Sequence, residues 1–267
     1  MSFGQDREDV QLEINVLGSH LKAPTTGAMI ALKRLARYLK GTADLGVVLK
    51  KPIDDVAGVV DLQGFSDSDW AGCEATRKSQ SSGHIEADGC PLHGFSRKQK
   101  PVSTSSAMAE YYCASGVAEE LMGFREIFIF FNYIVKATLL LDASAARGIC
   151  HREGMGKIKH LEVRSLWVQQ VVKAKVLNIG VVDTLRNKAD LGTKMLGAAR
   201  HVMLRKACGL MRAGDEDDES DPFLADTVAV ITNRTPRNID GAAALSVLTS
   251  LIAACCVKVA GAVAPSG

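Results

Sequence analysis

The pattern of apolar and polar residues divides most of this chain into helical and extended segments. Residues 1–20 are amphipathic but fit a helix or a strand equally well. Behind Pro24, apolar side chains recur at helical spacing and predict a helix that ends at Gly41. The other face of this helix is basic, which is usual for a surface helix whose charges are solvated, although a face turned to nucleic acid would look the same.

Extended segments dominate the next part of the chain. Residues 45–50 predict a short strand, and residues 58–67 predict a longer one. Residues 82–87 and 91–96 predict a hairpin, because Asp88-Gly89 between two extended runs favours a tight turn. We expect the long strand and the hairpin to form three antiparallel strands.

The second half of the chain alternates between helices and strands. Candidate caps at 103–106 open a long helix that continues to about Asn132. In order, the remaining predicted elements are a strand at 137–142, a helix at 143–150, a helix at 157–175, a strand at 176–182 and a helix with Asp190 in its first turn. This order predicts an α/β fold, a mixed sheet of about five strands with helices on both faces.

Four carboxylates occur where such a fold would bring them together. Asp67 and Asp142 end strands, Glu110 lies on the apolar stripe of the long helix, and Asp190 opens the last helix. Taken singly, they fit a turn, an N-cap or a favourable helix dipole. Because the crevice of an open α/β sheet lies at the carboxyl ends of its strands, we expect them to converge, and converging carboxylates require divalent cations. Oxygen-only ligands favour Mg²⁺, with Mn²⁺ as the alternative.

Composition narrows the setting of this site. The 267 residues, 47% of them hydrophobic, are sufficient for a full core. The seven cysteines include no C-x-x-C pair, which favours reduced thiols in an intracellular protein, cytoplasmic or nuclear, and argues against a zinc site. The N-terminus lacks the pattern of a signal peptide. We interpret the six scattered histidines as structural or surface residues.

Charge separates the body of the chain from its C-terminal part. Residues 1–214 hold 29 of the 32 Lys and Arg and 22 of the 30 Asp and Glu, a net charge of +7, which permits a polyanionic partner. Residues 215–221 are an acidic run typical of a disordered linker. The Ala-rich segment 241–264 is apolar, but its uninterrupted part is shorter than the roughly 20 residues of a membrane span. We therefore favour a packed or partly ordered helix and consider a membrane partner unlikely, with a membrane-associated interaction protein as the alternative.

Several motifs, in a fixed order, resemble one known family. They resemble the ribonuclease H domain, with its preceding connection segment, of the reverse transcriptase polyproteins of copia-type LTR retrotransposons. The similarity covers about residues 17–196. The motifs that carry it are Leu32–Thr42, Phe65–Gly72, Arg77–Gly83, Ser96–Lys100, Ser105–Tyr111 and Ala189–Lys194.

The resemblance implies a ribonuclease H-like fold and two-metal hydrolysis of the RNA strand in RNA-DNA hybrids. Asp67, Glu110, Asp142 and Asp190 would be the catalytic acids and metal ligands, and Asp69 matches a further family acid of less certain role. The polymerase portion of a longer polyprotein would be a partner. Phosphate contacts would come from Arg77, Lys78, Ser79, Lys98 and Lys100, although solvated loop residues would look the same.

Departures from the family pattern leave a second hypothesis open. Ala143 follows Asp142 where the family usually has Asn, and no histidine lies just before Asp190. A catalytically degenerate or co-opted relic that binds nucleic acid is therefore the alternative function. We interpret His160, in a further family motif, as structural. The expected divisions are a connection-like helical segment (1–55), the ribonuclease H-like domain (56–212), an acidic disordered linker (213–240) and an Ala-rich apolar tail (241–267).

Overall fold

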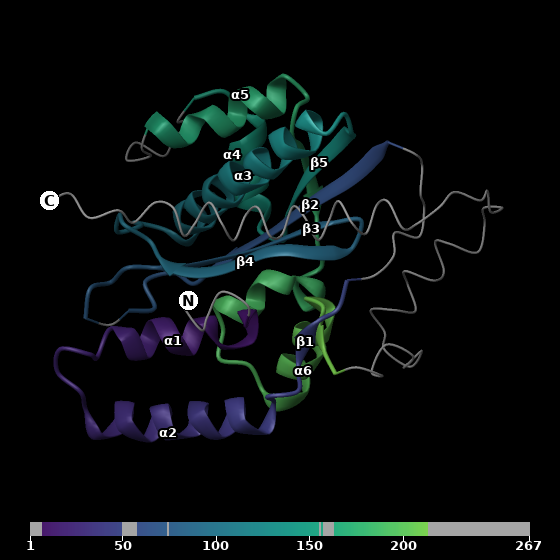
Figure 1. Ribbon diagram of the computed structural model, residues 1–267. Helices are drawn as coiled ribbons and strands as arrows, with labels where there is room; N and C mark the ends of the chain where they lie inside the picture. Colours follow the sequence, from purple (N-terminus) through teal and green to yellow (C-terminus); the bar gives the residue numbers. More distant parts are fainter. Residues whose placement is uncertain (1–6, 50–57, 74, 155, 157–162, 213–267) are drawn as a thin grey trace, which may run out of the picture.

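The central element is a five-stranded mixed sheet (Figure 1). The computed structural model describes residues 7–49, 58–73, 75–154, 156 and 163–212. The predictions for the acidic linker, the apolar tail and His160 concern residues outside these ranges. The strands of the sheet, in the spatial order β4-β3-β2-β5-β6, are β2 (Val59–Ser68), β3 (Gln80–Ala87), β4 (Cys90–Lys98), β5 (Ile134–Leu141) and β6 (Asn178–Val181).

The strand directions agree with the prediction. β2, β3 and β4 are antiparallel neighbours, and the turn between β3 and β4 places Asp88 and Gly89 at positive φ. β5 runs parallel to β2, and β6 runs parallel to β5. The predicted α/β class and the mixed sheet of about five strands are therefore confirmed.

Helices cover both faces of the sheet (Figure 1). On one face α3 (Ser106–Phe130) packs on β2, β3 and β5, and α4 (Ser144–His151) and α5 (Trp167–Lys173) lie outside it. The apolar stripe of α3, including Val117 and Leu121, is fully buried. Gly83 on β3 permits this approach, because a Cβ there would lie 2.6 Å from a side-chain carbon of Val117. The core therefore lies mainly between α3 and the sheet.

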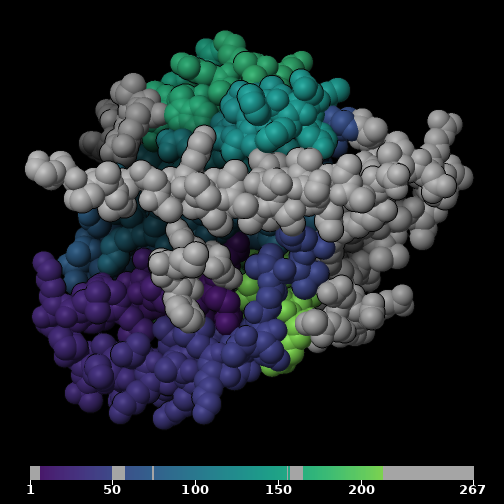
Figure 2. Space-filling model, viewed as in Figure 1, coloured from purple at the N-terminus to yellow at the C-terminus, as the bar shows by residue number. Residues whose placement is uncertain are grey.

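The layer on the opposite face comes from two parts of the chain that are distant in sequence. It contains η1 (Glu8–Val10), α1 (Gln11–Gly18), η3 (Thr184–Arg186), η4 (Lys188–Gly192) and α6 (Ala198–Ala207), and α2 (Thr26–Gly41) lies outside α1. Within this layer β1 (Gly46–Val47) pairs with β7 (Leu210–Met211), and Figure 2 shows these two parts of the chain in contact. Among the described residues, none of the helices combines the length and the apolar character needed to cross a membrane.

Three predicted elements differ from the observed ones. The strand at 45–50 is reduced to β1 and pairs with β7, outside the main sheet. Of the helix predicted at 157–175, the described part is a 3-10 turn, η2 (Val163–Leu166), followed by α5. Asp190 lies in the 3-10 helix η4, where the Asn187 side chain caps the N-terminus, and not in an α-helix.

Candidate active site

Asp67 and Asp142 meet at the carboxyl ends of two neighbouring parallel strands. Ser66 of β2 pairs with Leu141 of β5, so the next residue of each strand is an acid. Asp67 is buried, with 2% of its surface exposed. Asp142 is not the N-cap of α4, because Ala143 holds that position, and its carboxylate therefore remains available to the site.

Glu110 approaches these acids from the first turns of α3. Carboxylate oxygens of Asp67, Glu110 and Asp142 all lie within 4.8 Å of one another. Burial, followed by the charges of Asp67 and Asp142, raises the pKa of Glu110 to about 8. Burial likewise raises the pKa of Asp67, although Lys194 and Thr193 oppose the change. Three acids that disfavour one another's charge at such distances form a set of oxygen ligands suited to a divalent ion.

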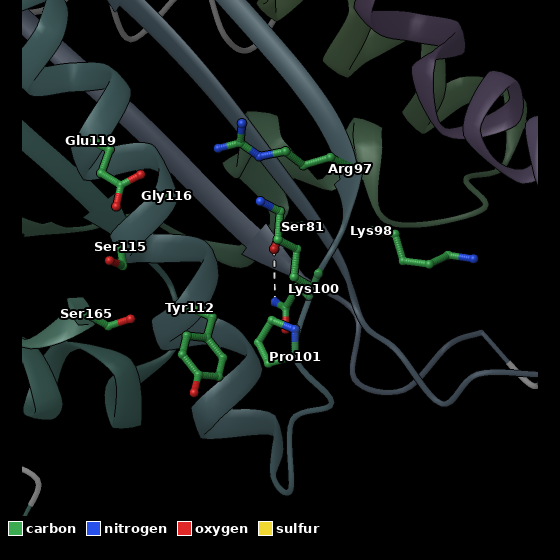
Figure 3. Close-up of a pocket in the computed structure, with 11 residues that line it drawn as sticks. Ser81, Arg97, Lys98, Lys100, Pro101, Tyr112, Ser115, Gly116, Glu119 and Ser165 are labelled. Carbon is green, nitrogen blue, oxygen red and sulfur yellow. Dashed lines mark hydrogen bonds between the residues drawn. The ribbon is translucent and has the colours of Figure 1, made fainter. Parts of the chain in front are cut away.

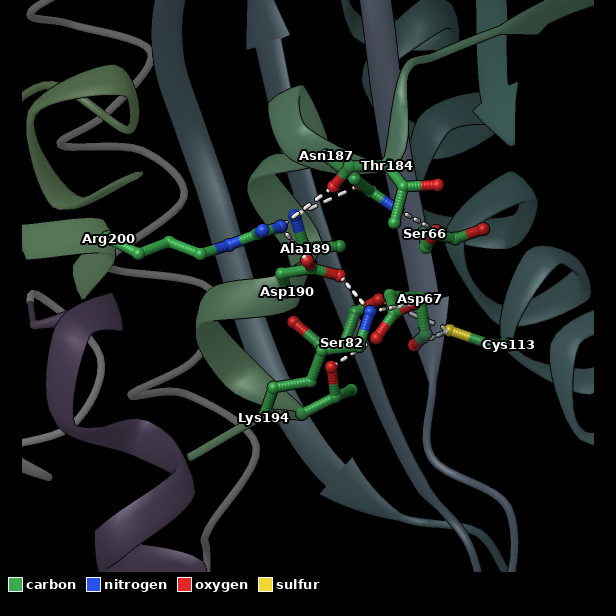
Figure 4. Close-up of polar contacts among 11 residues, drawn as sticks. Ser66, Asp67, Ser82, Cys113, Thr184, Asn187, Ala189, Asp190, Lys194 and Arg200 are labelled. Carbon is green, nitrogen blue, oxygen red and sulfur yellow. Dashed lines mark hydrogen bonds and ion pairs between the residues drawn. The ribbon is translucent and has the colours of Figure 1, made fainter. Parts of the chain in front are cut away.

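Asp190 joins this group through a lysine (Figure 4). The Nζ atom of Lys194 lies 3.3 Å from Oδ1 of Asp67 and forms a close ion pair with Oδ1 of Asp190, which is completely buried. Arg200 forms a second ion pair with Asp190, 2.5 Å long. Burial lowers the pKa of Lys194, but the charges of Asp67 and Asp190 outweigh it and raise the pKa. The ammonium group thus lies where the acids attract a cation.

Three side chains hold the segments that carry the acids. The Asn187 amide donates to the carbonyl oxygen of Ser66 (3.0 Å) and thereby fixes η4 against the end of β2. The Thr193 hydroxyl donates to Oδ2 of Asp67. Arg147 donates to the carbonyl oxygens of Leu141 (2.8 Å) and Asp142 (2.7 Å), which fixes the end of β5. These contacts bring residues from distant parts of the chain to one point.

Asp69 does not belong to the acid cluster. Its Oδ1 accepts a hydrogen bond from the backbone N–H of Gln80, and a Cβ at Gly72 would lie 1.8 Å from its Oδ2. Asp69 therefore stabilises the loop between β2 and β3. This loop contains three of the predicted nucleic-acid contacts, Arg77, Lys78 and Ser79.

A basic groove lies between the end of β4 and the side of α3 (Figure 3). Its volume is about 270 Å³, and it is lined in part by Arg97, Lys98, Lys100, Tyr112 and Gly116. The three cationic residues are exposed. The Arg97 guanidinium lies 4.0 Å from the centre of the Phe95 ring and 3.3 Å from the Glu120 carboxylate, which direct it across α3. A groove with this lining suits a chain of phosphates.

The other predicted nucleic-acid contacts lie in the loop after β2. Arg77 is exposed and Lys78 is half-buried. The Cys73 thiol connects this loop to β4, because Lys98 Nζ lies 3.2 Å from its sulphur. Ser79 has no exposed surface, and its hydroxyl oxygen accepts a hydrogen bond from the N–H of Ala71 (3.0 Å). In this position Ser79 supports the loop and offers no surface to a phosphate.

Sequence reasoning assigned no role to several residues of the site. Lys194 and Thr193 stood inside the motif that contains Asp190, and Arg97 stood inside the basic cluster. Asn187 and Arg200 gave no signal in the sequence, because their partners lie 121 and 10 residues away. Only the packing of η4 against β2 shows what these side chains contact.

Comparisons with known proteins find relatives of this chain among transposon polyproteins. It is 27% identical over 209 residues to the retrovirus-related Pol polyprotein from transposon RE2 of Arabidopsis thaliana, an alignment that covers 77% of this chain and 14% of the polyprotein. It is 24% identical over 208 residues to the Pol polyprotein from transposon TNT 1-94 of Nicotiana tabacum, covering 76% and 15%. The chain thus spans about one seventh of the length of these relatives. No family model matches it.

A search of solved structures matches the N-terminal RNase H domain of a Mycobacterium tuberculosis protein, determined as a fusion with maltose-binding protein. The similarity covers 55% of this chain and 98% of that chain, with 15% sequence identity and a TM-score of 0.36.

Proposed function

This chain is a homologue of part of the retrovirus-related Pol polyproteins of copia-type transposons, and we propose that it is a ribonuclease H. The proposed reaction is hydrolysis of the RNA strand of an RNA-DNA hybrid by the two-metal route, with Mg²⁺ as the cofactor and Mn²⁺ as a substitute. The proposed catalytic residues and metal ligands are Asp67, Glu110, Asp142 and Asp190.

The observation that carries this proposal is the convergence of the acids. Asp67, Glu110 and Asp142 come from β2, α3 and the end of β5, yet their oxygens lie within 4.8 Å of one another. Packing alone gives no reason to gather three acids at one point, because each raises the cost of ionising the others. Lys194 already places one positive charge between Asp67 and Asp190. The donor set therefore fits hard divalent cations, which prefer oxygen ligands.

The protein's own residues would bind and orient the reactants. When bound, the ions would lower the pKa of the attacking water and stabilise negative charge on the leaving oxygen. Thr193 and Asn187 keep Asp67 and η4 in place. Glu110 must be deprotonated to act as a ligand. Bound cations would favour the deprotonated form, because their charge opposes the effect of Asp67 and Asp142 on the pKa of Glu110.

The basic groove would hold the nucleic acid. Lys98 and Lys100, two of the predicted phosphate contacts, line it, and Arg97 adds a third cation. Arg77 and Lys78 lie in the loop that Cys73 connects to Lys98. Guanidinium and ammonium groups on an exposed groove bind phosphates without regard to base sequence. A hybrid positioned there would extend along α3 toward Glu110.

The domain organisation follows the same proposal. Residues 56–212 would be the ribonuclease H-like domain, and residues 1–55 would be a connection segment toward the polymerase portion of the polyprotein. In the structure η1 and α1 contact β4 and η4, so the first segment also supports the layer that carries Asp190. The boundary between the two segments falls outside the described residues.

A relic that binds hybrids without cutting them is the second candidate function. It is favoured by Ala143, whose methyl group supplies no hydrogen bond beside Asp142, where the family usually has Asn. The two functions predict the same binding groove. They differ only in whether the acids hold ions in a catalytic arrangement.

The decisive assay incubates the full chain with a hybrid labelled on the RNA strand, in Mg²⁺. Asp67→Asn and Glu110→Gln, shown by circular dichroism to be folded, are the test variants, and Glu126→Gln on the exposed side of α3 is the matched control. We expect cleavage by the parent and the control, none by the two test variants, and none of duplex DNA. Hybrid binding without cleavage by the parent would support the relic. Cleavage that persists in both test variants would overturn the assignment of the site.

A further inference from the structure

A second group of candidate metal ligands lies on the same face of the sheet as η4, away from the acids. It consists of Glu8 from η1, His84 from β3 and Cys208 at the C-cap of α6. Carboxylate, imidazole and thiol atoms of these three residues lie within 4.8 Å of one another. His84 and Cys208 are almost fully buried, with 1% and 3% of their surfaces exposed.

We propose that Glu8, His84 and Cys208 form a binding site for a divalent transition-metal ion, with Zn²⁺ as the best-matched ion. The site is distinct from the acid cluster and does not depend on nuclease activity. One nitrogen, one sulphur and one oxygen ligand suit a borderline-soft cation, whereas Mg²⁺ prefers oxygen alone.

The distances fit a single ion after small movements. Ligand atoms around one tetrahedral Zn²⁺ are separated by roughly 3.3–3.6 Å, as its bond lengths to N, O and S require. Nδ1 of His84 lies 2.8 Å from Oε2 of Glu8, so an ion would separate atoms that now share a hydrogen bond. The Glu8 side chain is 18% exposed and provides the side from which an ion and a fourth ligand, such as water, can enter.

The surroundings of His84 match those of a metal-binding histidine. Its second nitrogen, Nε2, lies 3.2 Å from Oε2 of Glu86, and Glu86 forms an ion pair with Lys188. A carboxylate that accepts from one ring nitrogen fixes the tautomer and directs the lone pair of the other nitrogen to the metal. In this tautomer Nε2 donates to Glu86 and Nδ1 faces Glu8. The ion pair between Glu86 and Lys188 joins the site to η4, because Lys188 is the first residue of η4.

Room for Glu8 depends on a glycine. Gly94 pairs with His84 across β3 and β4, and a Cβ at Gly94 would lie 1.9 Å from the carboxyl carbon of Glu8. Any other residue there would push the carboxylate away from His84. An ion at this position would tie η1, β3 and the end of α6 together, which are separated by more than 70 residues in sequence.

A buried ion pair is the competing explanation for the same geometry. An imidazolium of His84 between Glu8 and Glu86 would need no ion and would leave the Cys208 thiol protonated. Binding of a metal instead releases two protons to solvent, one from the Cys208 thiol and one from Nδ1 of the imidazolium, and forms metal-sulphur and metal-nitrogen bonds with no change in oxidation state. The Cys208 sulphur therefore distinguishes the two explanations, because it is a thiolate only when a metal is bound.

Cobalt reports directly on that sulphur. The full chain, freed of metal with a chelator and then supplied with excess Mg²⁺ to occupy the acid cluster, is titrated with Co²⁺. We expect one Co²⁺ per chain with a thiolate-to-cobalt charge-transfer absorption, which Zn²⁺ then removes by displacement. Cys208→Ser should lose the absorption, while Cys150→Ser, which alters a buried thiol on α4, should keep it.

Two further variants keep the test independent of any folding defect in Cys208→Ser. Glu8→Gln, at a partly exposed position, should weaken Co²⁺ binding on the order of 10-fold or more, and Glu86→Gln about 10- to 100-fold. No charge-transfer absorption in the parent at saturating Co²⁺, or an absorption that survives in Cys208→Ser, would overturn the proposal in favour of the ion pair.

Discussion

The Nζ atom of Lys194 lies 3.3 Å from Oδ1 of Asp67 and also contacts Oδ1 of Asp190. A lysine thus partly neutralises two of the four acids proposed to hold divalent ions. The same position cannot accommodate both an ammonium group and a divalent cation at full strength, because like charges repel. Metal binding and the Lys194 ion pairs are therefore expected to compete.

Replacement of Lys194 tests this competition. Lys194→Met should lower the free energy of unfolding in chelator by about 1 kcal/mol, and with it the melting temperature. The effect is modest because the Lys194 side chain is 40% exposed and its ion pairs are partly screened. The substitution should also lower the Mg²⁺ concentration for half-saturation, on the order of 10-fold. Thermal unfolding with and without Mg²⁺ measures both effects. Lys173→Met, which removes an exposed lysine paired with Glu153, is the control. Equal Mg²⁺ midpoints for Lys194→Met and the parent would contradict the expected competition.

Glu110 makes the stability of the metal-free protein depend on pH. Its pKa is about 8 in the folded protein, against an ordinary value of 4.5. Between these values the unfolded chain binds fewer protons than the folded protein, so the free energy of unfolding should fall as the pH rises through this window. Urea unfolding in chelator at about pH 5, 6, 7 and 8 measures the slope.

Glu110→Gln should flatten that pH dependence, because glutamine has no proton to release and also removes the charge acting on Asp67. Glu126→Gln, on the exposed side of the same helix, should keep the parental slope. If the free energy of unfolding of Glu110→Gln depended on pH as steeply as that of the parent, the group that releases a proton on unfolding would not be Glu110.

The Thr193 hydroxyl should influence metal binding through Asp67. It donates to Oδ2 of Asp67 and favours the charged carboxylate, and its loss should raise the pKa of that group further. A hydrogen bond to a charged group contributes about 1.5–3 kcal/mol, so Thr193→Val should weaken Mg²⁺ binding at neutral pH on the order of 10-fold. Calorimetric titration measures the change, with Thr184→Val at an exposed position as the control. Parental affinity in Thr193→Val would mean that this contact is lost when metal binds.

Lys100 should contribute a phosphate contact in the basic groove. Lys100→Ala should reduce the slope of log affinity for a hybrid against log salt concentration by about 1, because one fewer counterion is released. Fluorescence anisotropy measures this slope for Asp67→Asn with and without Lys100→Ala, because Asp67→Asn is expected to prevent cleavage of the hybrid. Lys136→Ala, exposed in the first half of β5, should leave it unchanged. The groove assignment fails if both lysine variants behave alike.

The sheet and the meeting of the acids could be predicted because they depend on local patterns. Alternation in β2, the Asp88-Gly89 turn and the apolar run of β5 determine strands, and parallel strands place Asp67 and Asp142 side by side. The stripe that contains Val117 and Leu121 placed Glu110 toward the sheet.

What the sequence could not predict depends on contacts between distant residues. The chemical environment of His84 comes from Glu8, 76 residues earlier, and from Cys208, 124 residues later. Rules for metal ligands search for short spacings such as C-x-x-C and cannot find a set whose members are so far apart. The sequence therefore argued against a zinc site, whereas the folded chain brings these three side chains together. The position of η4 against β2 likewise depends on a contact between distant residues, the hydrogen bond from Asn187 to Ser66.

The most direct measurement of the central claim is anomalous scattering from crystals of the full chain grown with saturating Mn²⁺. Two peaks about 3.5–4 Å apart are predicted, bounded by the carboxylates of Asp67, Glu110, Asp142 and Asp190, with Nζ of Lys194 moved out of contact with Asp67. Density that shows Lys194 still bridging Asp67 and Asp190, with no anomalous peak among the four acids, would contradict the account.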